Sequence, residues 1–124
     1  MITEKTNLIT ENELKSDLQQ FIGTENYYKV GMYKMLVTDG IKYMAEKVGA
    51  FWFLDIIGTE FNTLNKPFQV IYLNVNKDES CVITSREDAN EPVLHTRKIE
   101  YTDFPVGQYE FYLIDNIMLL KSEY

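Results

Sequence analysis

Apolar and polar residues follow helical spacing in the first half of the chain and strand spacing in the second. Thr10 is followed three positions later by Glu13, which is typical of a capping box, and an apolar stripe then continues to Gly23. The stripe consists of Leu14, Leu18, Phe21 and Ile22. This spacing predicts a short amphipathic helix whose stripe belongs to the core.

A second helical pattern begins at Thr38 and Asp39, both good N-cap residues, and ends at Gly49. Its apolar positions are Ile41, Met44, Ala45 and Val48. Between the two predicted helices, residues 27–37 indicate a loop with one short strand.

Residues 50–61 are almost continuously apolar, so periodicity alone does not separate a buried helix from a buried strand. The length of this block favours a helix. Asp55 lies in its most apolar stretch, where a carboxylate must find a partner, be protonated or face solvent.

From residue 68 onward the pattern changes to strands rich in valine, isoleucine, tyrosine and phenylalanine. The runs are 68–76, 80–85, 93–101 and 108–114, and Asp115-Asn116 predicts a two-residue hairpin turn into 117–120. The short connections favour sequential antiparallel pairing. We therefore expect one domain over residues 1–124, of the α+β class, with N-terminal helices packed on a C-terminal antiparallel meander of four to five strands.

Charge narrows the class of partner. Nineteen acidic and twelve basic residues among 124 give a net charge of -7, and such a surface repels phosphate backbones. Direct binding of nucleic acid by the chain alone is therefore not expected. The excess of acidic residues either keeps the protein soluble or forms an acidic patch that docks in the basic groove of a protein partner.

The chain carries no obvious signal for export or membrane insertion. Its first twenty residues lack an apolar signal core, and no run approaches the roughly 18 apolar residues that a membrane span needs. We therefore expect a cytoplasmic protein. The only cysteine, Cys81, stands in an apolar run, so an intrachain disulfide is impossible and a buried thiol is expected.

Candidate chemistry is sparse. His95 is the only histidine, and no spacing typical of zinc or calcium sites accompanies it. A nucleophile and base pair of Cys81 and His95 is possible in principle, but acidic neighbours disfavour a thiolate. The six glycines form no phosphate-binding loop. We predict no catalytic, metal or cofactor-binding residue, and expect a protein that is not an enzyme and needs no cofactor.

Tyrosine and tryptophan are favoured at protein interfaces, and this chain has nine tyrosines and one tryptophan. These rings either wrap a small core or serve as exposed anchors, the anchor candidates being Tyr27, Tyr28, Tyr33, Tyr43, Tyr109 and Tyr112. Combined with the acidic turns of the second half, they predict a partner-binding set of Asp78, Glu79, Glu87, Asp88, Glu91, Tyr109 and Tyr112.

Several short motifs carry a resemblance over most of the chain. They are Thr38-Asp39-Gly40, Ala45-Glu46-Lys47, Leu54-Asp55, Tyr101-Thr102-Asp103-Phe104-Pro105 and Ser122-Glu123-Tyr124. With these motifs the chain resembles a bacterial family catalogued as domain of unknown function 6876. The resemblance implies a helix at 50–61 and no assigned activity or site residues, and Lys121 stands where many relatives have proline.

The resemblance implies a small protein of the kind that bacteria, plasmids and prophages encode. The chain is also similar to an anti-CRISPR protein acting on the type VI-B RNA-targeting nuclease, which implies an inhibitor that contacts a positively charged, RNA-guided nuclease. Two alternatives stay open. One is a ligand-binding or sequestering domain with a pocket near Trp52, Asp55, Tyr101 and Asp103, and the other is a small hydrolase or nuclease using His95.

Overall fold

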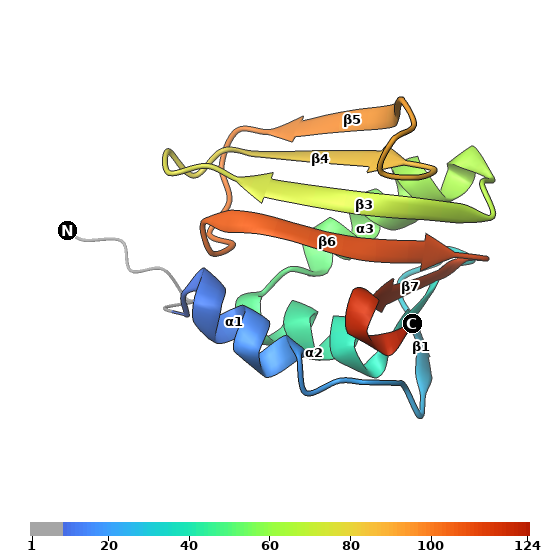
Figure 1. Ribbon diagram of the computed structural model, residues 1–124, viewed down its shortest axis with the longest axis horizontal. Helices are drawn as coiled ribbons and strands as arrows, with labels where there is room; N and C mark the ends of the chain where they lie inside the picture. Colours follow the sequence, from blue (N-terminus) through green and yellow to red (C-terminus); the bar gives the residue numbers. More distant parts are fainter. Residues whose placement is uncertain (1–8) are drawn as a thin grey trace.

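The protein folds as a seven-stranded sheet with helices against one of its faces (Figure 1), in a computed structural model that describes residues 9–124. The strand order is β1-β2-β7-β6-β3-β4-β5. The strands are β1 (Tyr27–Lys29), β2 (Leu36–Thr38), β3 (Phe68–Val75), β4 (Cys81–Arg86), β5 (Val93–Ile99), β6 (Gly107–Ile114) and β7 (Ile117–Leu120). The helices are α1 (Glu11–Leu18), α2 (Asp39–Val48) and α3 (Phe51–Ile56). The α+β class predicted from the pattern is confirmed.

The predicted meander of four to five antiparallel strands is wrong in two respects. The segment at 27–38 supplies two further strands, and β2 pairs with β7 in parallel. In addition, β6 does not follow β5 in the sheet but lies between β7 and β3. The helices are also not all N-terminal to the strands, because β1 and β2 precede α2 and a 3-10 turn, Lys121–Glu123, ends the chain.

The helix ends show how far local signals reach. Thr10 and Glu13 form the predicted capping box of α1, Thr38 caps α2, and Gly49 ends α2 with a left-handed φ of 65°. The first helix is shorter than predicted, because it ends at Leu18 and not near Gly23. Of the two apolar residues beyond it, Phe21 packs against the core and Ile22 is 83% exposed.

The predicted single helix at 50–61 is broken into α3, a π-helical turn (Ile57–Phe61) and a 3-10 turn (Asn62–Leu64). Contacts from elsewhere hold the π-helical turn. Tyr33 packs so closely on Gly58 that a Cβ there would lie 2.7 Å from its ring, and the Gln69 amide donates to the Phe61 carbonyl at 2.9 Å. Helix type in this block is therefore set by tertiary contacts, which apolar periodicity does not encode.

The connection from β5 to β6 contains the motif Tyr101-Thr102-Asp103-Phe104-Pro105, and the structure shows what two of its residues do. Thr102 donates its backbone N–H to the Glu79 carbonyl at 2.7 Å, which ties the connection to the β3–β4 turn. Phe104 then buries its ring against Phe53 and Tyr109, with centroids 6.4 and 4.9 Å apart. The connection is short, but this anchored ring directs the chain past β4 and β3 into the middle of the sheet.

Two other motifs, Thr38-Asp39-Gly40 and Ser122-Glu123-Tyr124, meet at the start of α2. Glu123 is buried, and its carboxylate accepts hydrogen bonds from the Thr38 hydroxyl at 2.6 Å, the Gly40 N–H at 3.0 Å and the Leu120 N–H at 2.9 Å. The negative charge also lies at the positive end of the helix dipole. Two motifs more than 80 residues apart thus form one structural joint.

Among the described residues no helix is both long and apolar enough to cross a bilayer. The expectation that the first twenty residues carry no signal core falls partly on residues 1–8, which lie outside the described part of the chain.

Candidate interaction surface

One face of the sheet carries a group of apolar side chains and has no helix over it. In Figure 1, α3 lies behind β3 and β6, and no helix is drawn in front of strands β3, β4 and β5. Alternation along the strands brings nine apolar side chains to this side: Leu36, Phe68, Val70, Tyr72, Val82, Tyr112, Ile114, Ile117 and Leu119. Val70 is 8% exposed and the others are half-buried, and none of the nine belongs to the core cluster between sheet and helices. The polar residues Asn74, Thr84, Thr96 and Gln108 lie on the same side. We call the set of nine apolar residues the open face.

The strand register arranges the open face in rows. Leu119 lies beside Tyr112, Tyr112 beside Val70, and the neighbouring row joins Ile117, Ile114 and Phe68. The rings of Phe68 and Tyr112 are 5.1 Å apart between centroids, and Tyr124 adds a third ring 5.3 Å from that of Tyr112. Antiparallel sheets that face water usually carry polar residues on that side, so apolar strand residues with no helix over them indicate an interaction surface.

Polar groups border the open face. Arg86 continues the row of Val70, and Lys98 lies opposite Val82. Glu110 lies opposite Tyr72 and forms an ion pair with Lys121 at 2.8 Å. An apolar centre with a polar rim is the usual anatomy of a protein interface.

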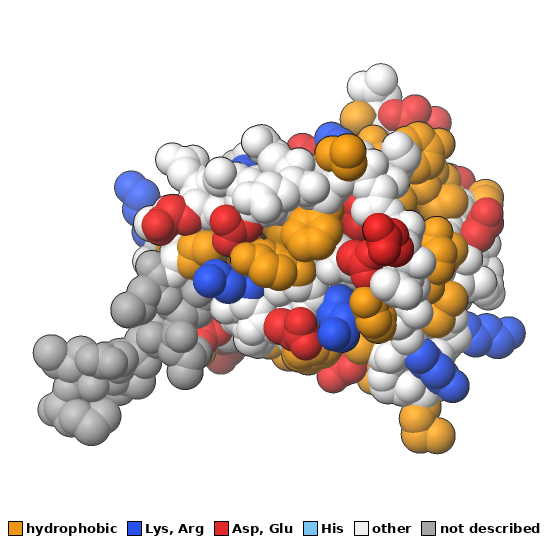
Figure 2. Space-filling view, turned by 90° about the horizontal axis from the view of Figure 1, so that it is seen from below, with side chains coloured by type: hydrophobic (Ala, Val, Ile, Leu, Met, Phe, Trp, Pro, Cys, Tyr) orange, Lys and Arg blue, Asp and Glu red, His pale blue; other side chains and the backbone are white. Residues whose placement is uncertain are grey.

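The predicted acidic residues do not form one patch with the open face. Asp78 and Glu79 lie in the β3–β4 turn, whereas Glu87, Asp88 and Glu91 lie in the β4–β5 turn at the other end of the sheet (Figure 1). The six residues of β4 separate the turns by about 20 Å. Figure 2, which views the molecule from below, shows carboxylates interspersed with lysines and not one continuous acidic area on that side.

Asp78 also has a structural role. Its carboxylate accepts hydrogen bonds from the hydroxyl of Ser80 at 2.6 Å and from its backbone N–H at 3.0 Å, so it closes the β3–β4 turn. These bonds, the hydroxyl's first, hold the pKa of Asp78 below its ordinary value.

The two tyrosines of the predicted partner-binding set point to opposite sides of β6. Tyr112 lies on the open face, half-buried among its neighbours. Tyr109 is 3% exposed and its hydroxyl donates to the Pro105 carbonyl at 2.9 Å, so its prediction as an exposed anchor is wrong. Alternation explains the difference, since odd positions of β6 face the core. Burial also raises the pKa of the Tyr109 hydroxyl.

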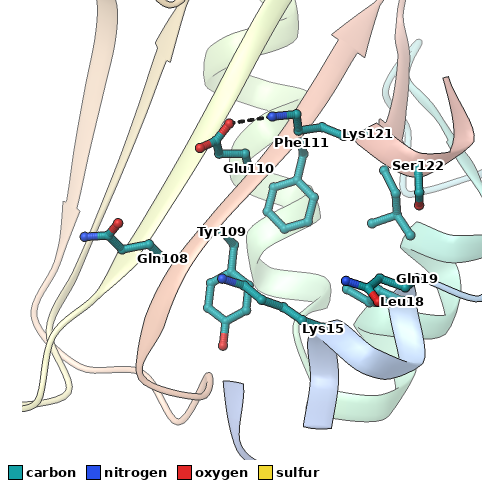
Figure 3. A pocket seen from close by; sticks show the side chains of 10 residues that line it. Lys15, Leu18, Gln19, Gln108, Tyr109, Glu110, Phe111, Lys121 and Ser122 are labelled. Atoms are coloured by element: carbon teal, nitrogen blue, oxygen red, sulfur yellow. Dashed lines mark hydrogen bonds and ion pairs between the residues drawn. The ribbon is translucent and has the colours of Figure 1, made fainter. Parts of the chain in front are cut away.

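Figure 3 shows this alternation beside a groove of about 310 Å³ between α1 and β6. Tyr109 and Phe111 point toward α1, while Gln108 and Glu110 point away from them. Two lysines flank the groove, but Lys15 is paired with Glu11 at 2.7 Å and Lys121 with Glu110. The groove therefore offers little uncompensated charge to a ligand.

His95 takes part in a cluster that sequence spacing did not indicate. Its Nε2 atom lies 2.9 Å from Glu60 of the π-helical turn, and Arg97 also pairs with Glu60. The ring of Phe61 packs edge-on against the imidazole at 4.9 Å. The cluster ties the edge strand β5 to the helical layer, which gives His95 a structural role.

The structure does not support a thiol or hydroxyl nucleophile that His95 would activate. Cys81 is buried as predicted, and it pairs with Ile99 at the far end of the β4–β5 ladder. Burial raises the pKa of its thiol to about 11, which disfavours a thiolate. Ser85 lies opposite His95 but is fully buried, so a substrate cannot reach its hydroxyl.

The ligand pocket expected near Trp52 and Asp55 is also not supported. Between α3 and the sheet, the ring of Phe53 packs on those of Phe104 and Phe111, with centroids 6.4 and 5.4 Å apart. Asp55 faces solvent and accepts a hydrogen bond from the Tyr33 hydroxyl at 3.3 Å. Within residues 9–124 no group of three or more histidine, cysteine, aspartate or glutamate side chains is placed to hold a metal ion.

Sequence reasoning missed the open face, although a signal for it exists. Strand β7 reads Ile-Met-Leu-Leu, and β3 and β6 carry apolar or aromatic residues at both odd and even positions. Strands with one solvated face alternate between apolar and polar residues, so these three runs indicate a sheet that is apolar on both sides.

Comparison with known proteins places the chain in a family without identifying a relative of known activity. No curated protein matches the sequence, and no solved structure matches the fold. A family model described as a family of unknown function, DUF6876, matches residues 12–124. The chain therefore belongs to this family.

Proposed function

We propose that this chain is a non-enzymatic binding protein that acts by protein–protein contact through its open face. The observation that carries the proposal is the uncovered apolar centre, in which the rings of Phe68, Tyr112 and Tyr124 lie within 6.4 Å of one another between centroids. Aromatic clusters of this kind supply much of the free energy of protein interfaces.

The reactive groups of the chain support a binding role over catalysis. His95 is held between Glu60 and the ring of Phe61, and the Cys81 thiol is buried with a raised pKa. Both side chains have structural work that accounts for their positions.

The specific form of the proposal is inhibition of an RNA-guided nuclease in the cytoplasm. It is supported by the net charge of -7, which suits a partner with a basic channel, and by the resemblance to an anti-CRISPR protein. Because the two acidic turns lie at opposite ends of β4, they could contact such a partner only as two separate areas.

A cleavage assay with a purified type VI-B nuclease and its guide RNA tests this form. We expect excess wild-type protein to reduce cleavage, and Tyr72→Ser/Tyr112→Ser to relieve the inhibition. Tyr101→Ser is a matched control, since Tyr101 is 61% exposed and lies outside the open face. A triple reversal, Glu87→Lys/Asp88→Lys/Glu91→Lys, measures the contribution of one acidic turn. Unchanged cleavage with excess wild-type protein would exclude this nuclease as the target.

Affinity capture from host lysate tests the broader proposal. The wild-type chain, Tyr72→Ser/Tyr112→Ser and Tyr101→Ser are each immobilised, and retained proteins are compared by mass spectrometry. We expect a protein retained by wild type and by Tyr101→Ser but lost with the open-face variant. Equal retention by all three would show that the open face is not the contact surface.

A further inference from the structure

The border of the open face differs in charge from the rest of the molecule. The chain as a whole has a net charge of -7, yet the polar rim defined above contains three bases, Arg86, Lys98 and Lys121, and one acid, Glu110. Within the strands that the structure describes, the charged side chains that border the open face are thus mainly basic, while Glu87, Asp88 and Glu91 follow Arg86 in the β4–β5 turn.

Two of the three bases are available to a partner. Lys121 is neutralised by Glu110, whereas no carboxylate of the described residues pairs with Arg86 or Lys98. The Arg86 guanidinium donates from Nη1 to the Glu91 carbonyl at 2.6 Å, which fixes its position at the edge of the face. Its remaining N–H groups can receive a carboxylate, and arginine binds carboxylates in a bidentate geometry.

We propose that the open face docks a protein surface with an apolar centre and an acidic border. This inference rests on the proposed function and names the chemistry of its partner. Complementary rim charges select the partner and increase the rate of association, while the aromatic centre supplies most of the affinity. Within the proposed function, the open face thus contacts an acidic-bordered area of the partner, and a basic area of the same partner would contact only the separate acidic turns.

Other occupants fit the face less well. A symmetric dimer through the open face would use the same surface on both copies. Among the described strand residues that border this face the acid is Glu110, which is already paired with Lys121, so a dimer offers no unpaired strand carboxylate to Arg86 and Lys98. A single-stranded nucleic acid needs a continuous positive groove beside the rings, whereas this face offers two unpaired bases on a chain of strongly negative charge.

Two designed peptides test the inference. Both are amphipathic helices with the same apolar stripe of leucine and tryptophan, flanked by glutamate in one and by lysine in the other. Binding of each fluorescently labelled peptide to the full chain is measured by anisotropy at low and high salt. We expect the glutamate-flanked peptide to bind more tightly, with an advantage that shrinks as salt rises.

Variants separate the aromatic contribution from the charge contribution. Tyr72→Ser/Tyr112→Ser should abolish binding of both peptides. Arg86→Glu/Lys98→Glu should lower the affinity for the glutamate-flanked peptide by about tenfold and raise the affinity for the lysine-flanked one. Lys34→Glu/Lys47→Glu makes the same change of charge outside the open face and should have a small effect on both peptides. Circular dichroism checks that each variant is folded.

The outcomes distinguish the two levels of the proposal. Tighter binding of the lysine-flanked peptide, with loss in the tyrosine variant, would overturn the acidic border and leave the open face as a protein-binding surface. No binding of either peptide, or binding that the tyrosine variant retains, would count against both. Sedimentation showing a dimer that Tyr72→Ser/Tyr112→Ser dissociates would assign the face to a second copy and overturn the inference.

Discussion

The Glu123 carboxylate joins three parts of the chain, so its removal should be costly. Glu123→Ala leaves the Thr38 hydroxyl and the Gly40 and Leu120 N–H groups without their acceptor, and we expect a loss of about 3 kcal/mol in the free energy of unfolding. Glu123→Gln keeps the shape but loses the charge, and should cost about 1–2 kcal/mol. Urea denaturation measures both. The control is Glu110→Gln, an exposed pair, which should change stability by less than about 0.5 kcal/mol.

Gly40 is required for the same joint because nothing larger fits. A Cβ at this position would lie 2.5 Å from Cδ1 of Leu120 and 2.8 Å from Oε1 of Glu123. We expect Gly40→Ala to cost about 1–3 kcal/mol, although alanine is the better helix former. Gly23→Ala is the matched comparison, since no atom lies within 4 Å of the added carbon. Its midpoint of urea denaturation should stay within error of the wild type or rise slightly, and an equal loss in both variants would contradict the steric explanation.

Cys81 makes stability depend on alkaline pH. Burial raises the pKa of its thiol to about 11, whereas the unfolded thiol titrates near its ordinary value of 9.0. Between these values the unfolded chain releases the proton and the folded chain keeps it, so stability is present below pH 9 and declines toward pH 11, by at most about 1.4 kcal/mol per pH unit. Cys81→Ala should lose this part of the decline in urea denaturation. Identical slopes in wild type and variant would contradict the assignment.

At the scale of elements, the sequence predicts where helices and turns begin and end better than it predicts which elements pack together. Capping at Thr10 and Thr38, termination at Gly49 and the turn at Asp115-Asn116 all depend on neighbours within four residues, and the structure confirms each of them. The π-helical turn depends instead on Tyr33, Gln69 and the β5 cluster, none of which is local. The strand order likewise depends on where Phe104 is buried, so it could not be predicted from connection length.

The Glu60 cluster predicts a local effect with little global cost. Glu60→Gln removes the charge that pairs with Arg97 and His95, and because these side chains are partly exposed we expect a loss below about 1 kcal/mol. Amide hydrogen exchange should nevertheless accelerate in β5, since this edge strand loses its tie to the π-helical turn. Glu87→Gln is the control, because the Glu87 pair with Lys66 is long, at 3.9 Å, and exposed. Unchanged exchange in β5 would show that the cluster does not hold the strand.

At the scale of the whole molecule, composition predicts a kind of surface but not its position. Net charge and tyrosine content both predict a protein-binding role, but neither specifies where on the fold the residues lie. The acidic turns separate because β4 lies between them, and Tyr109 is buried because β6 alternates. Apolar residues at both odd and even positions of β3, β6 and β7 signal a second apolar face, but which of these residues lie side by side depends on strands that are consecutive in the sheet and not in the chain, such as β6 and β3.

Two adjacent residues of β6 therefore separate stability from binding. Phe111 is 1% exposed and packs on Phe53, and Phe111→Ala should cost about 3–5 kcal/mol. Tyr112 points to the opposite side, where it contacts Phe68 and Tyr124, and Tyr112→Ala should cost about 1 kcal/mol. Urea denaturation of the two variants measures this difference. If the open face is instead filled by part of the chain in solution, Tyr112→Ala would destabilise the fold nearly as much as Phe111→Ala, and the surface would not be available to a partner.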